Sequence, residues 1–197
     1  MTEAPRSATV TRTTKETDVR VELMLDGAGT SVATTGMPFF DHMLQQLGTH
    51  GGFDLSVSCD GDLAVDGHHT VEDCGLAVGQ ALKDALGDKA GVRRFASIVV
   101  PLDEAAVEVA LDLSGRTFVV HDVPVPAEMI GTFDTGLVED FVRAFAQAAE
   151  LTVHVHLRGG RSPHHVVEAE FKALAKALRD ACSLTGQAGV PSTKGTL

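Results

Sequence analysis

The sequence predicts an α+β fold made of two similar units, each a small, mostly antiparallel sheet backed by two helices, with the helices packed between the two sheets. A short motif, His-His-x-x-Glu, occurs at 68–72 and again at 164–168, and 96 residues separate the two copies. Segments of the same kind surround each copy in the same order, which is typical of a tandem duplication. With 197 residues, of which 44% are apolar, the chain is long enough to bury a sizeable core.

Alternation of polar and apolar residues predicts the strands. In the first unit we expect antiparallel strands at 9–17 and 19–25, and in the second at 97–101, 106–113 and 117–120. Glycine-containing turns at 26–29 and 114–115 interrupt these strands.

Each unit continues with a helix, a strand and the helix that carries the motif. The first helices are expected at 38–51 and 135–149, and subtracting 96 aligns the strand at 150–153 with the strand at 54–57 without a gap. In the motif helices, apolar residues at 71, 78, 82 and 85 recur with helical period, and the apolar residues at 167, 174, 178 and 181 match them. We therefore divide the chain into a flexible start at 1–7, a first repeat at 8–91, a second repeat at 92–185 and a flexible tail at 186–197.

Composition excludes several classes of function. A net charge of −11 and a pI near 5.1 argue against a nucleic acid as the main partner, and the scattered basic residues suit a small anionic substrate better. The three cysteines are an odd number and two lie in periodic segments, which favours a reducing cytoplasm. Because we find neither an export signal nor a run of about 18 apolar residues, we expect no membrane span.

The repeated motif has the spacing of a metal site. Ser162-Pro163 supplies an N-cap and a proline at the start of the second motif helix, so the histidines fall in the first turn. Residues four apart share a helix face, so His68 and Glu72 can bind one ion, as can His164 and Glu168. The adjacent histidines, at 69 and 165, point elsewhere, since neighbouring residues diverge by about 100°. If the two helix starts face each other, the second histidine of each motif can bind the ion held by the His–Glu pair of the other motif. This arrangement gives two metal sites.

Longer motifs resemble one enzyme family. They are Phe39 to Leu44 (FFDHML), His68 to Asp73 (HHTVED), Asp112 to Arg116 (DLSGR), Pro163-His164-His165, and Pro191 to Gly195 (PSTKG). In these motifs, and essentially from end to end, the chain is similar to imidazoleglycerol-phosphate dehydratases. The resemblance implies a lyase of histidine biosynthesis that removes water from imidazole glycerol phosphate to give imidazole acetol phosphate. It also implies two Mn²⁺ ions per active site, sites shared between subunits, and an assembly of 24 chains.

The resemblance also assigns metal ligands. One ion would take His42, His69, His164 and Glu168, and the other would take His68, Glu72, His165 and one further residue. Many members of the family have a histidine where this chain has Asp140. A carboxylate can still bind Mn²⁺ there, or the position is lost from the site.

The implied chemistry uses the substrate's own ring. Metal ions on both ring nitrogens would hold the ring as imidazolate, whose charge expels the hydroxyl and acidifies the neighbouring C–H. Glu16, Glu72 and Glu168 are the candidate acids and bases, with no choice made among them. The phosphate would be held by Arg94, Arg116, Lys172, Ser192, Thr193 and Lys194, and the tail at 186–197 would close over the substrate.

Simpler interpretations stay open beside these. Without the resemblance, His42 reads as a core histidine, Glu16 as part of a solvated turn and Arg94 as half of a surface pair. The paired motifs themselves could be two solvated first turns. The alternative functions are a metal-organised storage or structural assembly without catalysis, and a metal-dependent phosphohydrolase.

Overall fold

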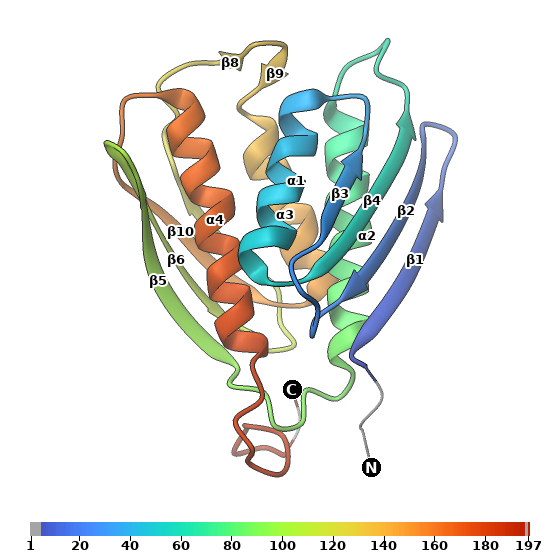
Figure 1. Ribbon diagram of the computed structural model, residues 1–197, viewed down its shortest axis with the longest axis vertical. Helices are drawn as coiled ribbons and strands as arrows, with labels where there is room; N and C mark the ends of the chain where they lie inside the picture. Colours follow the sequence, from blue (N-terminus) through green and yellow to red (C-terminus); the bar gives the residue numbers. More distant parts are fainter. Residues whose placement is uncertain (1–4, 196) are drawn as a thin grey trace.

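Two four-stranded sheets enclose four helices in the computed structural model, which describes residues 5–195 and 197 (Figure 1). Parts of both segments expected to be flexible, residues 1–4 and residue 196, lie outside the described residues. The first strand begins at Ser7, which is the last residue of the segment 1–7 that was expected to be flexible.

The first unit contains four strands and two helices: β1 (Ser7–Thr13), β2 (Thr17–Met24), β3 (Ser31–Thr34), α1 (Pro38–Gly51), β4 (Asp54–Gly61) and α2 (His68–Leu86). The sheet has the order β1-β2-β4-β3, in which only the β3–β4 pair is parallel. Along β2, Val19, Val21 and Leu23 are buried while the residues between them are exposed, as expected for a sheet with one face on the core.

The second unit repeats this arrangement: β5 (Phe95–Leu102), β6 (Ala105–Asp112), β7 (Phe118–Asp122), α3 (Leu137–Ala149), β10 (Thr152–Gly159) and α4 (Pro163–Cys182). Its sheet has the matching order β5-β6-β10-β7, and again only the last pair, β7–β10, is parallel. A two-stranded hairpin, β8 (Met129–Ile130) with β9 (Phe133–Asp134), is inserted before α3. The predicted duplication and α+β class are confirmed, and the hairpin and β3 are elements that the sequence did not reveal.

The gapless alignment of the two units at 96 residues is wrong for the segment before the motif helices. Strands β4 and β10 begin at Asp54 and Thr152, 98 residues apart, and the left-handed residues that end α1 and α3, Gly52 and Glu150, have the same separation. The motif helices keep the spacing of 96, so the stretch between the end of β4 and His68 is two residues longer than the stretch between the end of β10 and His164. A shift of two residues preserves the in–out alternation of a strand, so the pattern could not distinguish 96 from 98.

The four helices form the middle of the molecule and all begin at the same end, where the β1–β2 and β5–β6 turns also lie (Figure 1). Helix α2 packs on α3, and α1 packs on α4. Gly75 and Gly79 of α2 allow a close approach, because a Cβ on Gly79 would lie 2.4 Å from the carbonyl oxygen of Phe145 in α3. The predicted contact of helix with helix therefore brings both motif starts to one end of the protein.

Candidate metal centre

One cluster joins the second motif to α1. His164 and Glu168 lie one turn apart at the start of α4, where Ser162 caps the helix by accepting from the backbone N–H of His165 and Pro163 occupies the first turn. His164 Nε2 is 2.9 Å from Glu168 Oε2, and His42 Nε2 of α1 is 3.5 Å from the same oxygen. Ligand atoms of His42, His164 and Glu168 all lie within 4.8 Å of one another, so these side chains fit a divalent cation.

Glu168 remains ionised in this cluster. Burial raises its pKa, but hydrogen bonds from Lys172 and His164 outweigh that effect and leave the pKa below its usual value. Lys172 Nζ lies 2.6 Å from Glu168 Oε1. Lys172 was expected to hold phosphate, but within the chain it pairs with this carboxylate.

The corresponding residues of the first repeat also lie near one another, although their ligand atoms do not converge as those of His42, His164 and Glu168 do. His68 and Glu72 lie at the start of α2, with His68 Nε2 3.9 Å from Glu72 Oε2. Asp140 of α3 approaches the other ring nitrogen, with its Oδ2 3.2 Å from His68 Nδ1. Counting 98 residues from His42 leads to Asp140, so the aspartate occupies in α3 the position that the histidine occupies in α1. Its carboxylate oxygen suits Mn²⁺ as well as an imidazole nitrogen does.

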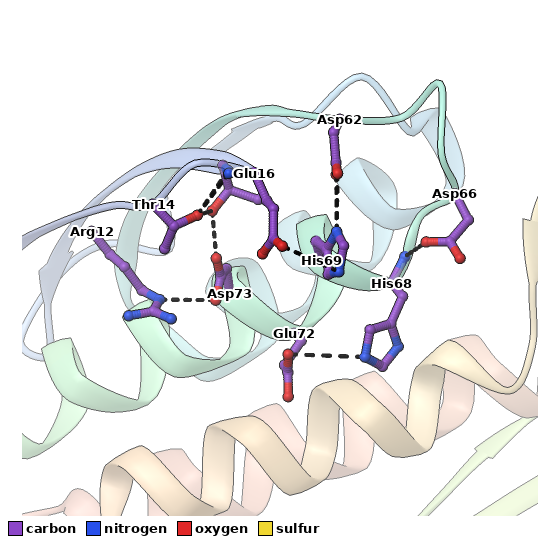
Figure 2. A network of polar contacts seen from close by, with 10 residues as sticks. Arg12, Thr14, Glu16, Asp62, Asp66, His68, His69, Glu72 and Asp73 are labelled. Carbon is purple, nitrogen blue, oxygen red and sulfur yellow. Dashed lines mark hydrogen bonds and ion pairs between the residues drawn. The ribbon is translucent and has the colours of Figure 1, made fainter.

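The second histidine of each motif points away from its own cluster, as the helical geometry predicts. Figure 2 shows His69 turned toward Asp62 and Glu16, while His68 turns toward Glu72 and α3. His165 turns likewise to the β5–β6 turn, where its Nδ1 lies 2.8 Å from a carboxylate oxygen of Glu104. Within one described chain, then, each predicted four-residue set brings together three members and leaves its fourth, His69 or His165, apart.

The carboxylates beside these two rings alter their electrostatics. The hydrogen bond with Asp62 raises the pKa of His69, and the hydrogen bond with Glu104 raises the pKa of His165. The same contact, with the backbone N–H of Ser162, lowers the pKa of Glu104 to about 2. Asp62 and Glu104 were not anticipated from the sequence, because a loop residue and a turn residue carry no local signal of where tertiary structure will place them.

Five of the six predicted phosphate residues lie together away from the metal clusters, beside the start of β5 and the C-terminal tail. Arg94, Arg116, Ser192, Thr193 and Lys194 line one pocket of about 350 Å³, together with Ser114, Gly115 and Leu197. Arg94 anchors this pocket: its Nε and Nη2 donate to Asp112 at 2.6 and 3.1 Å, and its Nη1 donates to the carbonyl of Pro191 at 2.8 Å. The tail is thus held to β6 through one guanidinium, which also lines the pocket.

No helix among the described residues has the length and apolar character needed to cross a bilayer.

A family model described as "Imidazoleglycerol-phosphate dehydratase" matches residues 35–178. The protein of that name from Acidothermus cellulolyticus is 57% identical over 193 residues, which cover 98% of this chain and 94% of the relative.

Two solved dehydratase structures resemble the fold. The enzyme from Staphylococcus aureus superposes with a TM-score of 0.82 at 35% identity, over 91% of this chain and 99% of its own. The enzyme from Pyrococcus furiosus gives a TM-score of 0.83 at 34% identity, over 95% of this chain and 100% of the Pyrococcus chain. At these identities the likeness extends beyond fold to family.

Proposed function

The chain belongs to the imidazoleglycerol-phosphate dehydratase family, hydro-lyases of histidine biosynthesis, and on that premise we propose that it acts through two Mn²⁺ ions held by the paired clusters. The observation that carries the proposal is the pairing itself. Each repeat presents a His–Glu pair one helical turn apart, and a residue of the facing helix joins each pair, His42 in one and Asp140 in the other. Nitrogen and oxygen donors in this mixture suit a divalent first-row cation.

We assign the ligands as two sets. One is His42, His69, His164 and Glu168, and the other is His68, Glu72, Asp140 and His165. When bound, the ions would stabilise the imidazolate form of the substrate ring, which lets the ring electrons expel the neighbouring hydroxyl. Proton transfer falls to the carboxylates that border the histidines, Glu16, Glu72 and Glu168.

We further propose that each active site is shared between subunits. The β6 strand begins beside Glu104, which contacts His165, and ends at Asp112, which contacts Arg94. Eight residues of strand separate the histidines from the phosphate pocket by about 25 Å. A substrate with a ring, three carbons and a phosphate spans only roughly 10 Å, so one chain cannot supply both ends of its own site.

Sharing also supplies the missing ligands. His69 and His165 lie at the end at which all four helices begin and are 32% and 33% exposed, so a neighbouring chain can reach them there. A closed assembly of identical chains, 24 as in the resemblance, would then place the phosphate pocket and tail of one subunit beside the metal centre of another.

The function is tested by giving the Mn²⁺-loaded protein imidazole glycerol phosphate and following the enolisable ketone by its ultraviolet absorbance in alkali. Ketone formation that disappears on chelation supports the proposal. Metal binding without ketone indicates a storage or structural assembly, and release of inorganic phosphate indicates a phosphohydrolase; either result overturns it.

Sharing is tested by mixing two inactive variants. His164→Ala damages the metal cluster and Arg116→Ala damages the phosphate pocket. If sites combine different subunits, co-expressed chains regain up to about a quarter of wild-type activity, because some sites receive both intact halves. A mixture that stays as inactive as its parents would mean that each chain builds its own site.

A further inference from the structure

Two carboxylates beside the metal centre have no place in the ligand sets. Asp62, in the loop before α2, lies with its Oδ2 and Oδ1 3.0 and 3.2 Å from Nδ1 of His69. Glu104, in the β5–β6 turn, lies with its Oε2 2.8 Å from Nδ1 of His165. The two histidine side chains are 32% and 33% exposed and the two carboxylate side chains 28% and 27%, so the contacts have closely matched surroundings.

The two carboxylates do not descend from one duplicated residue. Glu104 immediately precedes β6, and its counterpart in the first repeat is Glu16, which immediately precedes β2. Asp62 lies in the stretch before His68 that is two residues longer in the first repeat. The two repeats therefore reach the same atom of the same histidine from different parts of the chain, which copying of an incidental surface contact would not produce.

We propose that Asp62 and Glu104 are positioning residues that accept a hydrogen bond from Nδ1–H of His69 and His165 and so leave Nε2 of each ring as the metal-binding atom. A neutral imidazole has one N–H and one lone pair, and the partner of one nitrogen decides which tautomer is present. Carboxylates in this position also fix the ring plane and make the free nitrogen a better donor. The inference rests on the ligand roles proposed above for His69 and His165.

The arrangement separates the roles of the duplicated pair Glu16 and Glu104. Both oxygens of Glu104 have partners, because Oε2 contacts His165 and Oε1 accepts a hydrogen bond from the backbone N–H of Ser162 at 2.7 Å. Asp62 performs the same task in the first repeat, so Glu16 stays on the other side of the His69 ring, 3.9 Å from Nε2 and 53% exposed (Figure 2). Glu16 is thus free to meet a substrate at the face where His69 binds metal.

The tautomers can be read directly in the metal-free protein. Nitrogen-15 NMR reports which ring nitrogen carries the proton once the pH is raised far enough above the ordinary pKa of histidine for both rings to be neutral, since their carboxylates raise the pKa. We expect Nδ1–H at His69 and His165. His154, which has no carboxylate partner in the described part of the chain, serves as the reference for the usual Nε2–H form. Nε2–H at both motif histidines would overturn the proposal even if the protein binds metal.

The second measurement is the affinity of the protein for Mn²⁺. The concentration of unbound Mn²⁺ is followed by its electron paramagnetic resonance signal. Asp62→Ala and Glu104→Ala should each weaken Mn²⁺ binding by about tenfold to a hundredfold. Asp62→Asn and Glu104→Gln should recover much of it, since an amide oxygen still accepts from Nδ1–H. Asp60→Ala and Glu128→Ala, which remove exposed carboxylates that have no hydrogen bond or ion pair with either ring in the described part of the chain, are the matched controls.

The outcomes separate this inference from the proposed function. Wild-type protein that binds two ions, with alanine variants that bind equally well, rejects the positioning role and leaves the function standing. Wild-type protein that binds no Mn²⁺ rejects the function, and the tautomer measurement still decides whether the carboxylates orient the rings. If an alanine variant fails to fold, the amide variants and the wild-type spectrum decide.

Discussion

The first repeat has a half-buried ion pair where the second repeat buries alkyl groups. Asp73 on α2 accepts a hydrogen bond from Arg12 on β1 (Figure 2) and another from Thr17 on β2. The matching positions of the second repeat hold Ala169, Val100 and Ala105. Two of the three are almost fully buried and the third is 7% exposed, so apolar packing fills the same space.

At another position the second repeat has the polar pair and the first repeat has apolar packing. In the second repeat, His121 on β7 lies with its Nε2 2.9 Å from Glu170 on α4, and both side chains are buried. The matching residues of the first repeat are Ala33 and Cys74. Glu170 Oε2 has no hydrogen-bond partner among the described residues. Because a buried pair often stabilises no more than apolar packing of the same volume, the interior tolerates either solution.

What the two repeats keep in common is the end at which the helices begin. Both have His–His–x–x–Glu in the first turn, a third potential ligand on the facing helix, and a carboxylate on Nδ1 of the second motif histidine, His69 or His165. The interior polar clusters differ between the repeats, whereas both repeats have a set of nitrogen and oxygen donors at this end, although His42 and Asp140 differ. This contrast is the reason to assign function to the helix starts rather than to either buried cluster.

The largest effect should come from the one carboxylate in the second-repeat cluster. Glu168→Gln removes the anionic donor shared by His42 and His164, so turnover should fall by more than about a hundredfold, beyond the loss typical of residues that only orient ligands. Glu72→Gln should retain more metal, since Asp140 keeps a carboxylate in its cluster. Metal content and kcat measured side by side test this. Full metal content and activity in Glu168→Gln would remove Glu168 from the ligand set.

Asp140→His should make the two clusters alike, because it copies His42. Two ions should still bind, with the preference at this site shifted from Mn²⁺ toward Zn²⁺ by about tenfold as nitrogen replaces oxygen. Competition titration with the two metals measures the shift. Asp140→Ala is the companion variant, and wild-type stoichiometry and affinity in that variant would show that Asp140 binds no metal.

The next largest effect should be the loss of stability when the buried His121–Glu170 pair is broken. His121→Ala leaves Glu170 buried without its partner and should lower the free energy of unfolding by about 3–5 kcal/mol. The double variant His121→Ala/Glu170→Cys copies Ala33 and Cys74 of the first repeat and should recover most of that loss. Urea unfolding of metal-free protein at one fixed chain concentration measures both. Equal stability of the single and double variants would contradict the comparison.

The smallest effect is a dependence on pH. Burial lowers the pKa of His121, but the hydrogen bond and charge of Glu170, with the charge of Glu139, outweigh both burial and Arg143 and leave the pKa raised. The pair's contribution is therefore fully present below the unfolded pKa of about 6.5 and is lost as pH rises through the folded value. The stability of wild type relative to the double variant should decline over that range. A difference that is constant with pH would contradict this assignment.

Periodic features were the ones that the sequence could reveal. Helix α1 was expected at 38–51 and spans Pro38–Gly51, since a proline marks its start and glycines mark its end. The His–Glu pairs followed from helical spacing alone. The same spacing would have explained Lys172, because it lies four residues after Glu168 and so forms an ion pair along the helix.

Features that depend on tertiary structure were missed. Asp62 and Glu104 contact histidines 7 and 61 residues away in the chain, through a loop and a turn without periodic pattern. The two-residue difference between the repeats left the strand alternation unchanged, so the match of Asp140 to His42 became visible only with the strand ends in place. The four-residue edge strand β3 was too short to show alternation.

The central claim is that mirrored helix starts bind two divalent cations. Crystals grown with Mn²⁺ and measured for anomalous scattering near the manganese edge test it most directly. We predict one peak beside His42, His164 and Glu168 and another beside His68, Glu72 and Asp140, each completed by a histidine of a neighbouring chain. The absence of a peak at both clusters in crystals that contain Mn²⁺ would contradict the claim.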